Sequence, residues 1–293
     1  MDFFNGEGLL KLCKENNKKI SEVMLAREIQ LGETTKEEVY KKLAYSISIM
    51  KNSTTEPLKK PVNSMGGLLG GESKAVYDNA FMAGSMPLCG SVLSKAIAYS
   101  MAVLEVNASM GLIVAAPTAG SAGVIPGAVL SVCEEYNLGE DAIHSGLLNA
   151  SAIGYIIMRN ASVSGAEAGC QAEVGAASAM AASAVVEMMG GTPEMCLQSA
   201  TFALSNLLGL VCDPIAGLVE SPCQSRNAIG VANAITSAEL ALSGITHPIP
   251  FDEMAEAMLR VGRSLPFELR ETAMGGCAGT PTGCELGCKI CGK

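Results

Sequence analysis

The sequence predicts a mostly all-α protein, a helical domain whose glycine-rich loops carry the functional site. Three observations support this fold class. Alternation of apolar and polar residues with a period of two is rare along the chain. Only 4% of the residues are aromatic and Trp is absent, so small aliphatic side chains must build the core and let helix axes approach closely. Groups of glycines interrupt the chain at intervals of helical length.

The N-terminal part is predicted to contain two amphipathic helices within residues 8–50. The second would begin at Thr35, because Glu38 stands three residues later in the reciprocal capping-box pattern. Residues 51–63 contain two prolines and several hydroxyl residues, and they are predicted to form a linker or long loop. We therefore expect residues 1–60 to be a helical segment packed on the main domain.

The main domain, residues 61–293, would be a helical catalytic domain that ends in a cysteine-rich tail. Ala, Met and Leu dominate its long uncharged segments, so helices are favoured over strands. The predicted helices cover residues 74–83, 91–108, 122–136, 140–158, 171–189, 193–210, 227–242 and 251–262. Groups of glycines separate several of them, at residues 66–71, 117–123, 165–169 and 190–191.

Composition argues against several classes of protein. The net charge of −9 and the lack of a basic run disfavour a nucleic-acid partner. The N-terminus shows no signal-peptide pattern. The longest uncharged stretch, residues 106–133, is interrupted by Pro117 and Pro126, so no membrane helix is expected. We expect a cytoplasmic protein.

Eleven cysteines are conspicuous in such a chain, because a reducing compartment favours metal or redox centres over disulfides. Burial in the core is the ordinary state of a free cysteine, so most of the eleven should be core residues. Four crowd the C-terminus: Cys277, Cys284, Cys288 and Cys291.

Three motifs lie at the helix breaks. Residues 117–123 form a glycine- and hydroxyl-bearing turn before a predicted helix, an arrangement that suits a carboxylate or phosphate. Cys170 follows another glycine-flanked turn, at a predicted helix start that favours the thiolate. Cys212 and Cys223 are separated by ten residues that prolines and glycine hold out of a helix, so both thiols can turn toward a common point.

These motifs resemble the alpha chain of the bacterial iron–sulfur L-serine dehydratases, from about residue 10 to the end. The matching segments are SMGG at 64–67, APTAGSAGVIPG at 116–127, SGAEAGCQAEVG at 164–175 and CDPIAGLVESPC at 212–223. The resemblance implies a [4Fe–4S] cluster on Cys170, Cys212 and Cys223, with one iron open to act as a Lewis acid for the departing serine hydroxyl. The implied lyase reaction releases pyruvate and ammonia from L-serine.

The resemblance also implies a separate beta chain, in a larger assembly of alpha–beta pairs. Thr118, Ala119, Gly120 and Ser121 would bind substrate. Lys74 is the first candidate for the base that removes the Cα proton and Ser121 the second, while the partner chain is a third possible source. The two histidines, His144 and His247, are interpreted as structural.

The C-terminal cysteines allow other interpretations. The spacing of Cys284, Cys288 and Cys291 resembles the cluster loop of radical S-adenosylmethionine enzymes, and four close thiols could also hold zinc. A radical S-adenosylmethionine enzyme would need a barrel of alternating strands and helices, and the sequence shows no such alternation. A bland interpretation is a flexible tail. A sharper one has Cys288 or Cys291 occupy the open iron when substrate is absent.

Three other functions are weighed. Pyridoxal phosphate chemistry needs a Schiff-base lysine in a phosphate-binding α/β fold, so the helical pattern argues for an enzyme without pyridoxal phosphate. An L-cysteine desulfidase of the same superfamily is the nearest alternative, because an open iron would take a thiolate as readily as a hydroxyl. A non-enzymatic electron carrier or cluster scaffold would be expected to use four cysteine ligands.

Overall fold

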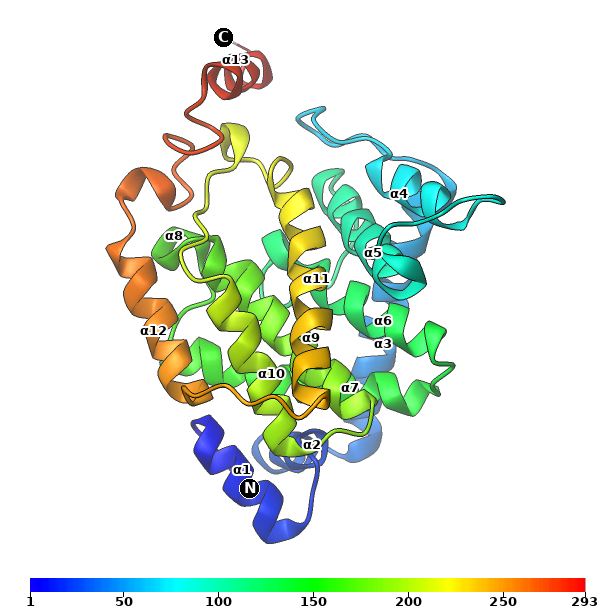
Figure 1. The fold of residues 1–293 in the computed structure, drawn as a ribbon, viewed down its shortest axis with the longest axis vertical. Coiled ribbons are helices and arrows are strands. Elements are labelled where there is room, and N and C mark those ends of the chain that lie inside the picture. Colours follow the sequence, from blue (N-terminus) through cyan, green and yellow to red (C-terminus); the bar gives the residue numbers. More distant parts are fainter. Residues whose placement is uncertain (293) are drawn as a thin grey trace.

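The computed structural model describes residues 1–292, which form thirteen α-helices and no β-strand (Figure 1), so the all-α prediction is confirmed. None of the described helices is long and apolar enough to cross a membrane. The helices are α1 Gly6–Asn16, α2 Ile20–Leu31, α3 Lys36–Lys59, α4 Glu72–Phe81, α5 Gly90–Ala108, α6 Val124–Glu135, α7 Glu140–Asn160, α8 Gly165–Ala168, α9 Ala176–Met188, α10 Pro193–Asn206, α11 Cys223–Leu242, α12 Phe251–Ser264 and α13 Pro281–Ile290.

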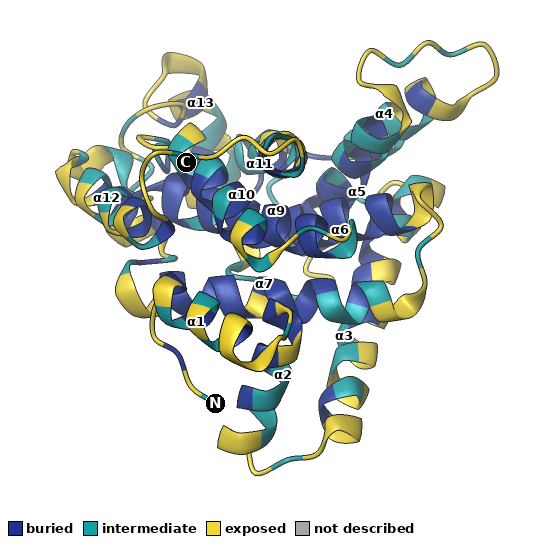
Figure 2. Ribbon diagram, turned by 60° about the horizontal axis from the view of Figure 1, so that its bottom comes forward, coloured by how far each residue is buried: buried dark blue, intermediate teal, exposed yellow. Residues whose placement is uncertain are grey.

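Helix α9 is the centre of the core. It packs against α6, α7, α10 and α11, and every residue from Ala176 to Glu187 is buried (Figure 2). Its sequence is mostly Ala and Ser, and the facing helices also place small residues at the contacts. Gly154 of α7, for example, lies where a Cβ would come within 2.6 Å of the Met180 Cε of α9. Small residues therefore set the close approach of the helices, as the composition predicts.

The N-terminal prediction is wrong in two respects. Residues 6–59 form three helices rather than two, and α3 continues through the predicted linker to Lys59. The buried face of α3 continues past Met50 through Ser53, Thr54 and Pro57. The Thr54 hydroxyl donates to the Met50 carbonyl at 2.9 Å, which lets a polar side chain occupy a buried helical position. The linker reading failed because this stripe changes from apolar to hydroxyl residues.

The predicted capping box is confirmed at the beginning of α3. The Glu38 amide donates to the Thr35 hydroxyl at 3.2 Å, and the Thr35 amide donates to Glu38 Oε2 at 3.1 Å. The N-terminal helices contact the rest of the chain closely, α2 against α7 and α3 against α5. A domain boundary near residue 60 stays a prediction.

The functional half of the chain also departs from the predicted helix limits. Helix α11 begins at Cys223, not at residue 227, and α10 ends at Asn206. Between α8 and α9, residues Gln171–Gly175 form a π-helical turn. The C-terminal end contains α13, which begins with a Thr280 cap, where the bland interpretation expected a flexible tail. These differences place Cys170 and Cys223 at the starts of helical segments.

Candidate functional site

Three separate segments bring Cys170, Cys212 and Cys223 together. Cys170 directly precedes the π-helical turn, and Cys223 is the first residue of α11. Cys212 lies in extended backbone, where its carbonyl accepts from the Glu271 amide at 2.7 Å. Cys170 and Cys212 are buried, Cys223 is half-buried, and none is in a disulfide. The three cysteines that the resemblance names thus lie in three separate segments, and their role as cluster ligands stays a prediction.

The electrostatics of these thiols reflect burial and mutual proximity. Burial raises the pKa of Cys170 and of Cys223 to about 12. Burial also raises the pKa of Cys212, and the neighbouring Cys170, Glu173 and Cys223 raise it further. Cys170 raises the pKa of both other thiols, so a positively charged group is needed to stabilise three thiolates here.

A half-buried guanidinium supplies part of that positive charge. Arg226, one turn into α11, opposes the raised pKa of Cys170 and Cys223. Its Nη2 lies 2.6 Å from Asp213 Oδ1, and its Nη1 donates to the Val211 carbonyl at 2.7 Å. These two contacts join the guanidinium of α11 to the residues on either side of Cys212.

The three thiols are donors of the type that an iron–sulfur cluster takes. Among the described residues, no three His, Cys, Asp or Glu side chains form a group able to hold one ion. This gives no support to a zinc site on the C-terminal cysteines. A cluster is held by thiolates that each bind a different iron, so the thiols need not meet at one point. Gly165 leaves room beside them, because a Cβ there would lie 3.0 Å from Cys212 Sγ.

The predicted substrate loop, residues 117–123, contacts the elements that carry the cysteines. It contains a 3₁₀ turn at Ala119–Ser121 and leads into α6. The Asn227 side chain of α11 donates to the Gly120 carbonyl at 2.8 Å and to the Cys223 carbonyl at 3.0 Å. The same side chain accepts from the Gly123 amide at 3.0 Å. Asn227 therefore holds the substrate loop against the beginning of α11.

Glu173 is a site residue that the sequence reasoning missed. Its Oε1 accepts from the Thr118 hydroxyl at 2.7 Å, and its Oε2 lies 3.9 Å from Cys212 Sγ. Burial raises the pKa of this carboxyl, and the Thr118 hydrogen bond opposes the rise. The signal was present in the sequence, because Glu173 stands three residues after Cys170 in the same motif. Glu173 joins the substrate loop to the cysteines.

Lys74, the first candidate base, lies in the first turn of α4. Its ammonium is 2.6 Å from Asp78 Oδ2, and no hydrogen bond or ion pair of the described residues joins it to the substrate loop. Its neighbour Ser73 is tied to the site indirectly. The Ser73 amide and the Gln224 amide group both donate to Glu105 Oε1, at 2.8 and 3.1 Å. Gln224 directly follows the proposed ligand Cys223.

The second candidate base, Ser121, is buried in the substrate loop, and its hydroxyl lies 3.2 Å from the Thr118 hydroxyl. The two histidines pack against aromatic rings. His144 lies edge-on to Tyr40 with ring centroids 4.8 Å apart, and His247 lies 5.3 Å from Phe202. The structural interpretation suits both positions.

The tail lies on the cysteine loop, residues 212–223. Helix α13 packs against the turn Ile215–Gly217 inside that loop, at the top of Figure 1. The Cys277 amide donates to Asp213 Oδ2 at 2.6 Å, which fixes the chain before α13. Cys288 and Cys291 are exposed. The tail is therefore beside the proposed iron site without filling it.

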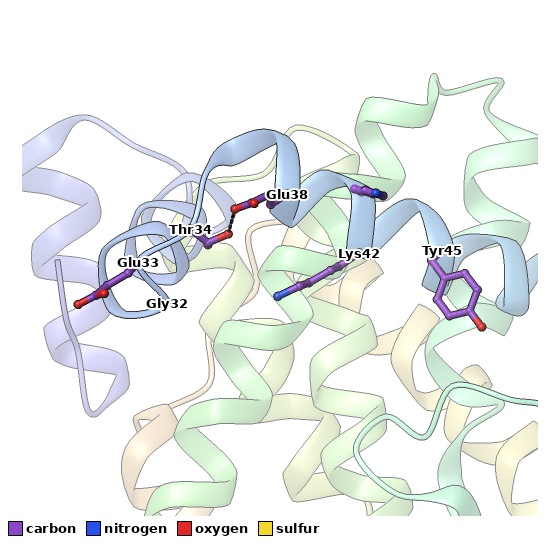
Figure 3. Close-up of a pocket in the computed structure, with 7 residues that line it drawn as sticks. Gly32, Glu33, Thr34, Glu38, Lys42 and Tyr45 are labelled. Atoms are coloured by element: carbon purple, nitrogen blue, oxygen red, sulfur yellow. Dashed lines mark hydrogen bonds between the residues drawn. The ribbon is translucent and has the colours of Figure 1, made fainter.

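A surface pocket lies elsewhere, between the end of α2 and α3 (Figure 3). Thr34 and Glu38 line it, but the Thr34 hydroxyl donates to Glu38 Oε2 at 2.5 Å and that carboxyl also caps α3. None of the predicted site residues lines this pocket, so it lends no support to another catalytic centre.

Comparison with known proteins agrees with the resemblance. A family model described as "Serine dehydratase alpha chain" matches residues 15–278. A "Probable L-serine dehydratase, alpha chain" of Bacillus subtilis is 47% identical over 99% of this chain and 96% of its own length. The "L-serine dehydratase, alpha chain" of Peptoniphilus asaccharolyticus is 47% identical over 95% of this chain and 94% of its own. An "L-serine dehydratase" of Streptomyces coelicolor is 36% identical over 94% of this chain but 60% of its own length.

Proposed function

The chain belongs to the serine dehydratase alpha chain family, and on that premise we propose that it is the catalytic chain of an iron–sulfur L-serine ammonia-lyase. One observation carries this proposal. Cys170, Cys212 and Cys223 come from three segments of the chain, yet Cys170 raises the pKa of the other two, and the half-buried Arg226 pairs with Asp213, the residue after Cys212. That donor set suits a [4Fe–4S] cluster.

When bound, the cluster would supply a Lewis acid for the hydroxyl that leaves Cβ of serine. The chain's own residues would bind and orient the substrate. The backbone amides of Ala119 and Gly120 would offer donors to the serine carboxylate, and Thr118 and Ser121 would line the same site. Glu173 accepts from the Thr118 hydroxyl and so holds it in one orientation. Removal of bulk water from this partly exposed loop when substrate binds would strengthen these contacts.

A base on the protein would take the Cα proton, while hydroxide leaves Cβ and departs as water. The resulting aminoacrylate tautomerises, takes up water and loses ammonia, which leaves pyruvate. Lys74 is proposed as the base and Ser121 as the second candidate. Lys74 must first leave Asp78 to act, because the observed ion pair holds its ammonium. The Ser73–Glu105–Gln224 connection keeps the beginning of α4 beside Cys223 meanwhile.

The tail would regulate the cluster. We propose that Cys288 or Cys291 occupies the open iron when serine is absent. The position of α13 on the turn Ile215–Gly217 supports this, since the turn belongs to the loop that ends in Cys223.

The assembly is proposed to contain a beta chain in alpha–beta pairs, in the cytoplasm and without pyridoxal phosphate. The words "alpha chain" in the names of two relatives support the partner. The test is anaerobic reconstitution with ferrous iron and sulfide, with and without that partner, followed by pyruvate release from L-serine. Pyruvate should appear when cluster and partner are both present. Release of sulfide from L-cysteine in preference to pyruvate from L-serine would favour the desulfidase, and reversible one-electron chemistry without turnover would favour the carrier.

A further inference from the structure

In the short loop before α4, residues 64–69, several backbone groups are fixed by hydrogen bonds. The Ser64 amide donates to the Leu69 carbonyl at 3.0 Å, and the Met65 amide donates to the Ala108 carbonyl at the end of α5 at 2.9 Å. Gly67 has a φ of +74°, in the left-handed region that favours glycine. The Met65 side chain is exposed. The loop thus exposes the Met65 side chain to solvent while hydrogen bonds to the rest of the protein hold its backbone.

The carboxyl group that holds it belongs to Glu220, which is only 1% exposed. Glu220 Oε2 accepts from the Ser64 hydroxyl at 2.6 Å and from the Leu68 amide at 3.0 Å. Its Oε1 accepts from the Gly66 amide at 2.6 Å. Any Cβ at Gly66 would lie 2.9 Å from that oxygen, so glycine is required for the close approach. Three donors from one loop therefore meet on a single buried carboxyl.

Glu220 is also part of the cysteine loop. It precedes the proposed iron ligand Cys223 by three residues, and its carbonyl accepts from the Gln224 amide at 2.9 Å. The adjacent Val219 packs against a small apolar group that contains Ala122 of the substrate loop. A shift of Glu220 would consequently disturb both the 64–69 loop and the beginning of α11.

A second carboxyl fixes the far end of the same segment. Glu105 of α5, fully buried, accepts from the Ser73 hydroxyl at 2.9 Å and from the Gln224 side chain at 3.1 Å. The chain from Ser64 to Ser73 is thus tied at both ends to the residues that flank Cys223. Because both ends are held in this way, residues 64–73 can move only together with the beginning of α11.

We propose that Glu220 is a positioning residue that couples the order of the 64–69 loop to occupancy of the three cysteines. Binding at Cys223 fixes the beginning of α11, which fixes Glu220, which in turn fixes the loop. By linkage, an ordered loop stabilises the bound cluster by the same free energy. The inference rests on the proposed function in one respect, the identity of Cys223 as an iron ligand.

The experiment measures amide hydrogen exchange of residues 64–69 in the full chain, before and after anaerobic reconstitution with ferrous iron and sulfide. Glu220→Gln replaces one acceptor by a donor and leaves at least one loop donor unpaired. Glu239→Gln is the matched control, since it makes the same change at an exposed position of α11. Ser64→Ala is a second variant that removes one donor and keeps the carboxyl. Visible absorbance reports the bound cluster in each sample.

In the wild-type chain and in Glu239→Gln, cluster uptake should slow exchange of the 64–69 amides by about tenfold, the size of one or two hydrogen bonds to a buried acceptor. Glu220→Gln should take up cluster with little such protection, and Ser64→Ala should fall between. If Glu220→Gln does not fold, a full wild-type response in Ser64→Ala overturns the coupling.

The coupling and the proposed function are contradicted by different outcomes. Cluster uptake by the wild-type chain without any slowing of loop exchange overturns the coupling and leaves the proposed function intact, as does equal protection in Glu220→Gln. A wild-type chain that binds no cluster contradicts the proposed function itself, and the coupling falls with it.

Discussion

At the scale of single residues, two of the proposed iron ligands, Cys170 and Cys223, differ from the core thiols in having a cation, Arg226, as a neighbour. Cys13 and Cys196 are as buried as Cys170, and burial raises their pKa as well. Their further neighbour is Glu187, an acidic residue, whereas Cys170 lies beside the guanidinium of Arg226. A buried thiol next to a cation is the better candidate for a thiolate ligand.

Cys212→Ala should weaken cluster binding by at least about 100-fold, because the lost group is a ligand rather than a second contact. Cys133→Ala is the matched control, a buried cysteine outside the three loops. It should keep the cluster and lose about 1 kcal/mol of unfolding free energy. Iron and sulfide content after anaerobic reconstitution gives the measurement. Equal iron content in the two variants would remove Cys212 from the site.

Thr118→Val should lower kcat/KM for L-serine about 10- to 100-fold, because one Glu173 oxygen would be buried without its donor. Thr118→Ser keeps the hydroxyl and should stay within about threefold of the wild-type value. Steady-state pyruvate release by the reconstituted complex measures both. If valine and serine at position 118 behave alike, the Thr118–Glu173 contact does not orient the substrate.

Sequence alone could name some of these residues and not others. The cysteines were identified because a resemblance carried them over, since the distance of 42 residues from Cys170 to Cys212 follows no local rule. Glu173 and Glu220 stood within the quoted motifs but looked like ordinary surface carboxylates. Their roles depend on partners 55 to 156 residues away, and such pairings are properties of the packed structure.

At the scale of elements, small residues determine how the helices pack. Periodicity predicted most of the helices, and the composition predicted their close approach. The wrong end predicted for α3 has a physical cause. The Ser53 and Thr54 hydroxyls both donate to the Met50 carbonyl, so polar side chains can lie on the buried face of this helix. A pattern search that scores only apolar residues ends such a helix too early.

Gly127→Ala in α6 should lower the free energy of unfolding by about 1 to 3 kcal/mol, although alanine is the better helix former. An added Cβ would lie 2.9 Å from the Ala96 carbonyl oxygen of α5, and that backbone cannot move aside cheaply. Gly287→Ala in α13 is the control, with its nearest neighbour 4.0 Å away, and should be neutral or stabilising. Chemical denaturation measures both. A neutral Gly127→Ala would mean that the α5–α6 contact is loose.

Removal of residues 284–293 should change the resting cluster spectrum and tighten serine binding, since the proposed thiol competitor is lost. The double variant Cys288→Ser, Cys291→Ser should do the same while keeping α13, and Cys284→Ser serves as the control. Anaerobic absorption spectra and serine titration provide the measurements. The tail has no regulatory role if spectrum and serine affinity are both unchanged in the truncated chain.

At the scale of the whole molecule, one helical core holds several distant loops in register. Residues near positions 66, 118, 170 and 220 meet around the beginnings of α11 and the π-helical turn, although more than 150 residues of chain separate the first from the last. Glycine and proline predicted where the chain leaves its helices. They could not predict that these breaks share one end of the core, because that depends on how α5, α9 and α11 pack together.

A titration of activity against bound iron tests most directly whether the chain works through an iron–sulfur cluster. The full chain, combined with its partner under anaerobic conditions, would be loaded with increasing ferrous iron and sulfide, and pyruvate release from L-serine would be measured on each sample. Activity should rise in proportion to the chains that carry a four-iron cluster and should vanish after complete removal of iron. Undiminished pyruvate release from the iron-free complex would contradict the cluster-dependent mechanism.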